Sequence, residues 1–141
     1  MLGAVSRYWR HLFRGNSRSD HQRIARIRDG GLEVLPPSSG FTPREGEVIH
    51  AEGVVHARDD SRDLDLGGGI LLVTNRAIVF FTSRKKWRVP WRSIEQAVFR
   101  RSRTLQVKTS GGKSFAFKIP STSEAEVISA TLVVVMAATI E

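Results

Sequence analysis

The chain has 141 residues, 40% hydrophobic and 26% charged, which is the balance of a globular protein with one domain and an extension. Because it has no cysteine, disulfides and thiolate metal sites are excluded, and a reducing, cytoplasmic location is expected. Its net charge of +8 favours an anionic partner, namely a lipid surface, an acidic protein or nucleic acid, although an ordinary basic surface would carry the same charge.

The beginning of the chain is predicted to form two short helices. Apolar residues recur at helical spacing over residues 2–14, and Arg7, Arg10 and Arg14 fall largely on the other face. These cations interrupt the apolar run, which excludes a secretory signal. A capping box and a glycine stop predict a second helix over residues 19–29.

Helices this short need a surface on which to fold. The basic helix could dock on the domain body or on a second subunit; the alternatives are an anionic membrane and the phosphates of a nucleic acid. Residues 36–46 are rich in Pro and Gly and are predicted to be a linker. We therefore expect a basic amphipathic helical extension over residues 1–35 and one domain over residues 47–141.

The domain is predicted to begin with a strand over residues 47–57. Its inward side chains would be Ile49, Ala51 and Val55, and Gly53 on the same face indicates a bulge or a barrel corner. The following segment, residues 58–65, is rich in Asp and lacks the spacing of a calcium-binding loop, so we expect a solvated loop.

Residues 67–99 contain three short apolar runs separated by turns, without a helical period. Ile, Val, Phe and Trp crowd these runs, as half-buried strands prefer. A tight turn is expected at Asn75–Arg76, because Asn tolerates a positive φ. The segment is predicted to form strand, turn, strand, basic loop, short strand, turn and strand.

This stretch resembles the central hairpins of GRAM and bacterial PH-like domains, which share the pleckstrin-homology (PH) superfold. The matching positions are Gly69, Leu72, Val73-Thr74-Asn75-Arg76, Ile78 to Phe81, Arg84 to Arg88 and Val89-Pro90-Trp91. The resemblance spans roughly residues 45–139. At Ala77 the chain departs from the pattern, since family members often have a second basic or bulky residue there.

The resemblance implies that a C-terminal helix plugs one open end of the barrel. It also implies that the first two strands and their loop would supply the cations of a lipid pocket. Only Arg58 and Arg62 could take that role here, and each has Asp beside it. This argues against a typical phosphoinositide pocket.

The basic loop is the candidate contact site, with four cations around one indole. The cations would meet anionic groups, while Trp87 would enter a membrane interface or stack on a base. Alternatively, the loop is solvated and Trp87 folds onto the barrel. The predicted contact residues are Arg84, Lys85, Lys86, Trp87 and Arg88. The secondary basic contacts are Arg100, Arg101, Arg103, Arg7, Arg10 and Arg14.

Alternating apolar residues complete a set of seven strands with short connections. This pattern predicts a mainly β fold: a PH-like seven-stranded antiparallel barrel or sandwich, capped by a C-terminal helix, with a short N-terminal helical extension. The predicted strands are residues 47–57, 69–74, 77–82, 86–90, 94–100, 104–109 and 113–119.

The predicted C-terminal helix begins after a Ser cap at position 121 or 123 and is apolar on almost every side. It must therefore be covered on more than one side. One face would plug the barrel. The other would be covered by Trp9, Leu12 and Phe13 of the N-terminal helix, by a second subunit in a homo-oligomer, or by a bilayer, for which about 16 apolar residues are short.

No catalytic motif is present: the four histidines are dispersed, and the glycines at positions 67–69 precede a strand rather than a helix. We therefore expect no enzymatic activity, cofactor or metal site. The sequence favours a binding or adaptor module that contacts an anionic membrane surface or an acidic protein. The alternatives are a nucleic-acid-binding protein and a structural oligomerisation module.

Overall fold

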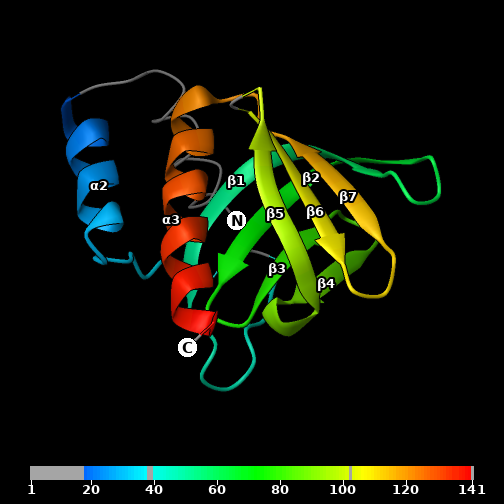
Figure 1. Cartoon of the computed structure of the whole chain (residues 1–141), viewed down its shortest axis with the longest axis horizontal. Helices are drawn as coiled ribbons and strands as arrows, with labels where there is room; N and C mark the ends of the chain where they lie inside the picture. Colours follow the sequence, from blue (N-terminus) through cyan, green and yellow to red (C-terminus); the bar gives the residue numbers. More distant parts are fainter. Residues whose placement is uncertain (1–17, 38–39, 102, 141) are drawn as a thin grey trace.

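The computed structural model of the chain describes residues 18–37, 40–101 and 103–140. Two helices, α2 (Arg18–Arg28) and α3 (Thr122–Ile140), and an antiparallel β-sheet form three layers, with α3 between α2 and the sheet (Figure 1). The predicted helix over residues 2–14, including Trp9, Leu12 and Phe13, lies outside the described residues.

Seven strands form the sheet in the order β4-β3-β2-β1-β7-β6-β5, and a one-turn helix, η1 (Trp91–Ser93), follows β4. The first strand pairs with β2 over most of its length and with β7 through residues 56–59, so it joins the β1–β4 half to the β5–β7 half. The predicted seven-stranded antiparallel fold with a C-terminal helix is confirmed. The strands are β1 (Ile49–Asp59), β2 (Leu64–Thr74), β3 (Ala77–Phe81), β4 (Lys86–Pro90), β5 (Ile94–Arg100), β6 (Thr104–Thr109) and β7 (Ser114–Lys118).

The second strand begins five residues before its predicted start at residue 69. The pairing of β1 with β2 continues beyond an irregularity after Ala57, so that Asp59 lies opposite Leu64. Most side chains in this extended part are exposed or half-buried. Backbone pairing continues there with little apolar burial, since Leu66 packs only partly against the core, and the sequence therefore has no apolar run that predicts it.

The turn after β2 forms where it was predicted, but for a different reason. Asn75 does not adopt a positive φ; among the described non-glycine residues only Asp63 and Arg101 do so. Instead, Oγ1 of Thr74 accepts the backbone N–H groups of Arg76 (3.1 Å) and Ala77 (3.0 Å). The threonine hydroxyl thus closes the turn, as short polar side chains often do.

The predicted inward face of β1 is buried, but Gly53 does not mark a bulge. It pairs regularly with Leu71, and the register shifts lie elsewhere in the strand. A Cβ atom at this position would lie 2.8 Å from Cδ1 of Ile128. The glycine therefore allows α3 to approach the sheet closely.

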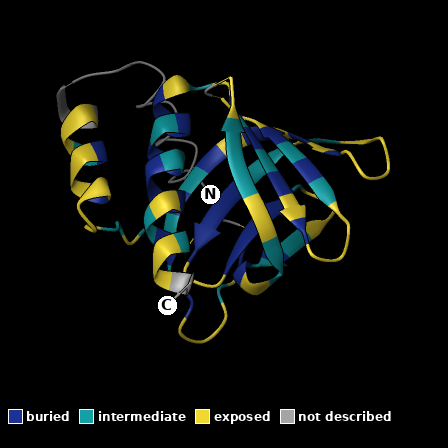
Figure 2. Cartoon of the chain, in the orientation of Figure 1, coloured by how far each residue is buried: buried dark blue, intermediate teal, exposed yellow. Residues whose placement is uncertain are grey.

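Helix α3 is buried from two sides (Figure 2). Its sheet-facing side chains, including Ile128 and Leu132, join the core of the sandwich, and Ser121 caps its N-terminus by accepting the N–H of Glu124 (3.2 Å). On another side, Ile24 and Ile27 of α2 pack against Val127 and Ala130. Within the described residues, α2 therefore supplies the second cover that the apolar helix requires.

None of the described helices combines the length and the hydropathy needed to cross a bilayer.

The segment between α2 and β1 is tied to the rest of the domain. Arg23 of α2 forms a bidentate ion pair with Glu33, and Leu35 bridges to Ile49. Farther along, Phe41 is buried and stacks on Phe81 of β3, with ring centroids 6.3 Å apart. Part of the predicted linker thus covers the outer face of β3.

A substitution in α2 should show how much the packing of α2 on α3 contributes to the stability of the chain. Ile27 is fully buried, so Ile27→Ala should lower the free energy of unfolding by about 2–4 kcal/mol through lost burial and a residual cavity. Urea denaturation would measure the change. The exposed Gln22 on the same helix provides the control, because Gln22→Ala should change stability by less than about 0.5 kcal/mol. Equal stability of the two variants would contradict this packing.

A buried carboxyl group lies in the first turn of α3. Desolvation raises the pKa of Glu124 to about 8, and the nearby Glu52 adds to the shift, while the backbone N–H of Val54 and the charge of Arg23 oppose it. The unfolded chain releases this proton near pH 4.5, whereas the folded chain retains it to about pH 8. The free energy of unfolding should therefore fall as the pH rises between these values.

Glu124→Gln should remove this pH dependence. Because Gln is never charged, the variant should be more stable than the native chain by about 1–3 kcal/mol at pH 7, and the difference should vanish at about pH 4. Chemical denaturation at a series of pH values would measure it. Glu126→Gln, two residues along the same helix at a half-buried position, is the control. No gain at pH 7 would contradict the burial of a neutral carboxyl group.

Candidate functional site

Two basic hollows flank strand β4. The first, which we call the arginine pocket, has a volume of about 320 Å³ and is lined by Arg44, Asn75, Arg76, Arg88, Pro90, Trp91 and Arg92. The second, the seam groove, has a volume of about 490 Å³ and runs between β4 and the β6–β7 turn; its lining includes Lys86, Trp87, Val89, Lys113 and Phe115. Arg88 and Pro90 line both hollows.

The alternation of β4 separates the predicted contact residues. Trp87 lies opposite Phe80 with ring centroids 5.3 Å apart, so the indole packs toward the core and is only half-buried. The next residue, Arg88, points to the other face, where it pairs with Glu47. The five predicted residues therefore do not share one face, and Trp87 contributes to the wall of the seam groove.

Three of the predicted cations form what we call the hairpin tip: Arg84, Lys85 and Lys86. All three are exposed, and none pairs with an acid among the residues that the structure describes. Oγ1 of Thr82 holds the turn by accepting the N–H groups of Arg84 and Lys85, both at 3.2 Å. Nζ of Lys86 lies 5.5 Å from the centroid of the Phe41 ring, a cation–π contact.

The positive and negative side chains of the β1–β2 loop form ion pairs with one another. Arg58 pairs with Asp60 (3.2 Å) and with Asp63, and Arg62 pairs with the buried Asp59 (2.9 Å). Burial alone would raise the pKa of Asp59, but hydrogen bonds from Ser61 and Arg62 and the charge of Arg62 outweigh it and hold the pKa below its usual value. Each arginine of the loop is thus already engaged by a carboxylate of the same loop.

Among the secondary basic contacts, those at the β5–β6 turn lie at the other end of the sandwich. Arg103 donates to the backbone carbonyl of Pro120 at 3.1 Å, next to the start of α3, and Arg100 donates to the side chain of Gln106. The six residues of β6 separate this turn from Lys113, a distance of about 17 Å along the strand. These cations therefore form no common surface with the hairpin tip. Arg7, Arg10 and Arg14 lie outside the described residues.

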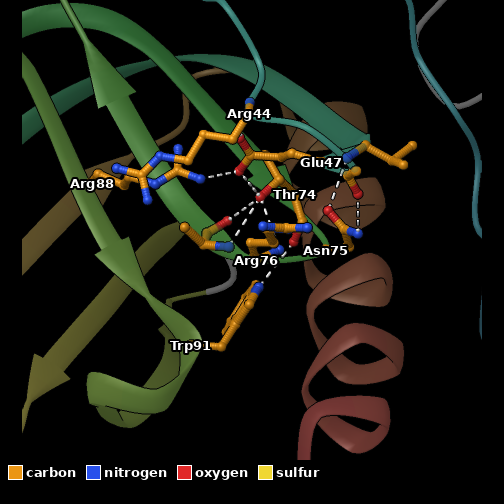
Figure 3. A network of polar contacts seen from close by, with 10 residues as sticks. Arg44, Glu47, Thr74, Asn75, Arg76, Arg88 and Trp91 are labelled. Carbon is orange, nitrogen blue, oxygen red and sulfur yellow. Dashed lines mark hydrogen bonds and ion pairs between the residues drawn. The ribbon is translucent and has the colours of Figure 1, made fainter.

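A buried carboxylate organises the arginine pocket (Figure 3). The side chain of Glu47 is inaccessible to solvent and accepts hydrogen bonds from the N–H of Arg44 (3.0 Å), the hydroxyl of Thr74 (2.7 Å) and the guanidinium of Arg88. Desolvation would raise the pKa of Glu47, but these hydrogen bonds and the charge of Arg88 outweigh it and hold the pKa below its usual value. Glu47 is therefore ionised and compensates the charge of Arg88.

Asn75 joins the β2–β3 turn to the segment before β1. Its Oδ1 accepts the N–H of Val48 (2.8 Å), and its Nδ2 donates to the carbonyl of Gly46 (3.0 Å). On the other side of the turn, Nε1 of Trp91 donates to the carbonyl of Thr74 at 2.9 Å. Three segments that are distant in sequence are thus held together around the pocket.

Several of these residues had no role in the sequence-based prediction. Arg44 lies in the predicted linker and Glu47 directly follows it. No local pattern in the sequence relates either residue to Arg92 or Lys113. The signals in the sequence are the run from Thr74 to Arg76 and the Val89-Pro90-Trp91 step, which indicate the fold, and Arg88, which belongs to the predicted basic loop. Among the residues that the structure describes, no three His, Asp or Glu side chains gather closely enough to hold a metal ion.

No family model and no curated protein matches the sequence. Among solved structures, the chain is similar to Inner Membrane Complex Sub-compartment Protein 3 from Toxoplasma gondii, with a TM-score of 0.53, 9% identity and 90% of each chain covered. It is also similar to the C-terminal domain of an unknown protein from Leishmania infantum, with a TM-score of 0.50 and 15% identity over 65% of this chain and 87% of that chain. The N-terminal PH domain of human ARAP2 gives a TM-score of 0.48 at 14% identity, covering 72% of this chain and 90% of that chain.

At these identities the likeness concerns the fold alone. The seven-stranded antiparallel sheet and the C-terminal helix α3 packed on it are the features expected of a PH-like fold. The chain therefore has the PH-like fold that residues 67–99 predicted.

The buried ion pair gives a prediction about stability. Glu47→Gln leaves Arg88 half-buried without its counter-charge and should lower the free energy of unfolding by about 3 kcal/mol at pH 7. Because the pKa of Glu47 is lowered in the folded state, the stability that it contributes is present above about pH 4.5 and is lost as the pH falls. The difference between the native chain and the variant should thus shrink in acid.

Thermal or urea denaturation at pH 7 and at pH 3 would measure both effects. Glu45→Gln is the control, because Glu45 is exposed and has no ion pair with another described residue. A loss in Glu45→Gln as large as that in Glu47→Gln would show that net charge, not the buried pair, is responsible.

Proposed function

We propose that this PH-like domain is a non-enzymatic binding module that contacts an anionic membrane surface through the hairpin tip. The observation that carries the proposal is the placement of Arg84, Lys85 and Lys86, three adjacent exposed cations without an acidic partner among the described residues. Lys113 reaches the same end of the sandwich from the β6–β7 turn and lines the seam groove together with Lys86. Four cations from two turns can thus face one anionic surface.

The geometry supports contact with a surface rather than with a headgroup held deeply between loops. Both arginines of the β1–β2 loop are neutralised by aspartates of that loop, and this loop lies beside the β6–β7 turn, since the N–H of Asp60 donates to the carbonyl of Ser114 at 2.8 Å. In Figure 1 both connections lie on the side of the molecule away from α3. A flat, charge-driven contact avoids the acidic loop, whereas a pocket between the loops would include it.

Such a contact is weak and depends on salt. Each basic residue close to an anionic leaflet contributes roughly 1 kcal/mol, so the tip and Lys113 together supply about 4 kcal/mol. The inward position of Trp87 withholds the aromatic anchor that would strengthen it. We accordingly propose reversible, peripheral association with a cytoplasmic membrane surface.

The motif around Thr74 to Arg76 and Val89 to Trp91 favours the GRAM or bacterial PH-like group within this fold, and that assignment is part of the proposal. An acidic protein surface is the other partner to which the same cations are suited. A homo-oligomer through α3 would have to use the strip that α2 leaves uncovered, around Val133, which is 67% exposed.

Charge removal at the hairpin tip tests the membrane contact. Arg84→Gln with Lys85→Gln removes two cations and should weaken binding to vesicles containing phosphatidylserine by about 2 kcal/mol, which is roughly thirtyfold. Co-sedimentation at low salt would measure binding. Because the tip is exposed, the thermal stability should not change.

The matched control is Lys108→Gln with Lys118→Gln, which removes the same charge from exposed positions on β6 and β7. It should bind almost as well as the native chain. Equal losses in the two double variants would show that net charge alone drives binding, and no binding to anionic vesicles at low salt would refute the membrane contact. Retention of a short duplex DNA or RNA in the absence of vesicle binding would favour the nucleic-acid alternative.

A further inference from the structure

We propose that the arginine pocket is a second binding site, separate from the hairpin tip, for a small molecule or headgroup that carries a phosphomonoester. Four arginines line the pocket, and the side chains of Arg44, Arg76 and Arg92 pair with no acid among the described residues. Only Arg88 is compensated, by the buried Glu47. The hollow therefore gathers uncompensated positive charge, which attracts an anion.

The shape of the donors favours phosphate. A guanidinium group presents a planar fork of N–H donors that matches two oxygens of a phosphate, and several forks together favour the dianion of a phosphomonoester over a single carboxylate. Lysine is absent from the pocket lining, although the chain uses lysine at the hairpin tip. The pocket thus consists of the cations that are best suited to directional phosphate recognition.

The backbone that carries the arginines is held in place before any ligand binds. Arg44 precedes the segment that Asn75 ties to the β2–β3 turn, and its N–H is held by Glu47. The guanidinium of Arg76 packs against Gly46, where φ is +75° and a Cβ atom would lie 2.8 Å from Nη2. The carbonyl of Arg76 accepts the N–H of Trp91 at 3.1 Å, which places the residue before Arg92. Because this backbone is already ordered, binding has to restrict only the side chains.

The size of the hollow limits the ligand. A volume of about 320 Å³ accommodates a phosphate with a small organic group and is too small for a helix or a folded partner. Pro90 and the edge of Trp91 form a partly apolar wall beside the arginines, against which carbon atoms of that organic group can lie. The same chemistry is offered by a soluble phosphorylated metabolite and by a lipid headgroup with a terminal phosphate.

The pocket is spatially independent of the membrane contact proposed above. Pro90 lies opposite Ala77 at one end of the β3–β4 pair, and Lys86 lies opposite Phe81 at the other, about 13 Å away along the strand. Variants of the two sites can therefore be compared in one protein. Arg76 and Arg92 are the residues to change, because both are exposed, whereas replacing Arg88 would leave Glu47 buried without its partner.

The first experiment titrates the full chain with glycerol 3-phosphate and follows backbone and arginine side-chain N–H resonances by NMR. We expect saturable shifts at Arg76, Trp91 and Arg92, and at least tenfold weaker binding in Arg76→Gln and in Arg92→Gln, with unchanged thermal stability. Dimethyl phosphate, a diester with one charge, should bind more weakly than the monoester. Arg84→Gln, which alters the hairpin tip, should bind as the native chain does.

The second experiment separates the two sources of the phosphate. Vesicles with phosphatidic acid, which has a terminal phosphate, are compared with phosphatidylglycerol vesicles. A preference for phosphatidic acid that disappears in Arg76→Gln but persists in Arg84→Gln supports a lipid headgroup. Binding of glycerol 3-phosphate without that preference supports a soluble ligand. Absence of saturable shifts at millimolar concentrations would overturn the proposal, whatever the result at the hairpin tip. Affinity in Arg76→Gln and Arg92→Gln equal to that of the native chain would overturn it as well.

Discussion

The buried carboxylate of Glu47 is the constraint on which this region of the protein depends. A charge removed from water is tolerated only if it is paired and hydrogen-bonded, and Arg88, Thr74 and the N–H of Arg44 meet that requirement from three separate segments. The carboxylate therefore forces the segment before β1 onto the β2–β3 turn and onto β4. Once these segments meet, the arginines that they carry also meet, so the arginine pocket is a consequence of satisfying one buried charge.

The residues that make the fold recognisable are also the residues that build this region. Thr74 closes the β2–β3 turn and binds Glu47; Asn75 ties that turn to Val48; and Trp91 binds the carbonyl of Thr74 through its indole. Each side chain thus serves the local turn and a contact between distant segments at once. A binding site supported in this way lies on rigid backbone, which is the condition for selective recognition of a small anion.

Ion pairs neutralise some of the described cations of the chain and leave others uncompensated. In the β1–β2 loop the arginines form ion pairs with neighbouring aspartates, and Arg88 forms an ion pair with Glu47. Two groups of cations without an acidic partner among the described residues lie at the two ends of the β3–β4 hairpin. One end is an exposed tip suited to a charged surface, and the other is a hollow suited to a single anionic group. Helices α2 and α3 lie on the side of the molecule away from the β1–β2 and β6–β7 connections (Figure 1), and α3 also contacts η1.

Alternation and apolar content in the sequence predicted the seven strands and the C-terminal helix, because these signals act through near neighbours that any folded state of this chain must satisfy. The sequence also indicated that α3 needs a second cover. That α2 supplies this cover through Ile24 and Ile27 is seen in the packing of the folded chain and not in its sequence. The pairing of the cations is also a property of the fold. Arg88 forms an ion pair with Glu47, which lies 41 positions away in the sequence. The inward direction of Trp87 depends on its partner Phe80 in β3. Pairing and direction are set by register and long-range packing, which local sequence does not encode.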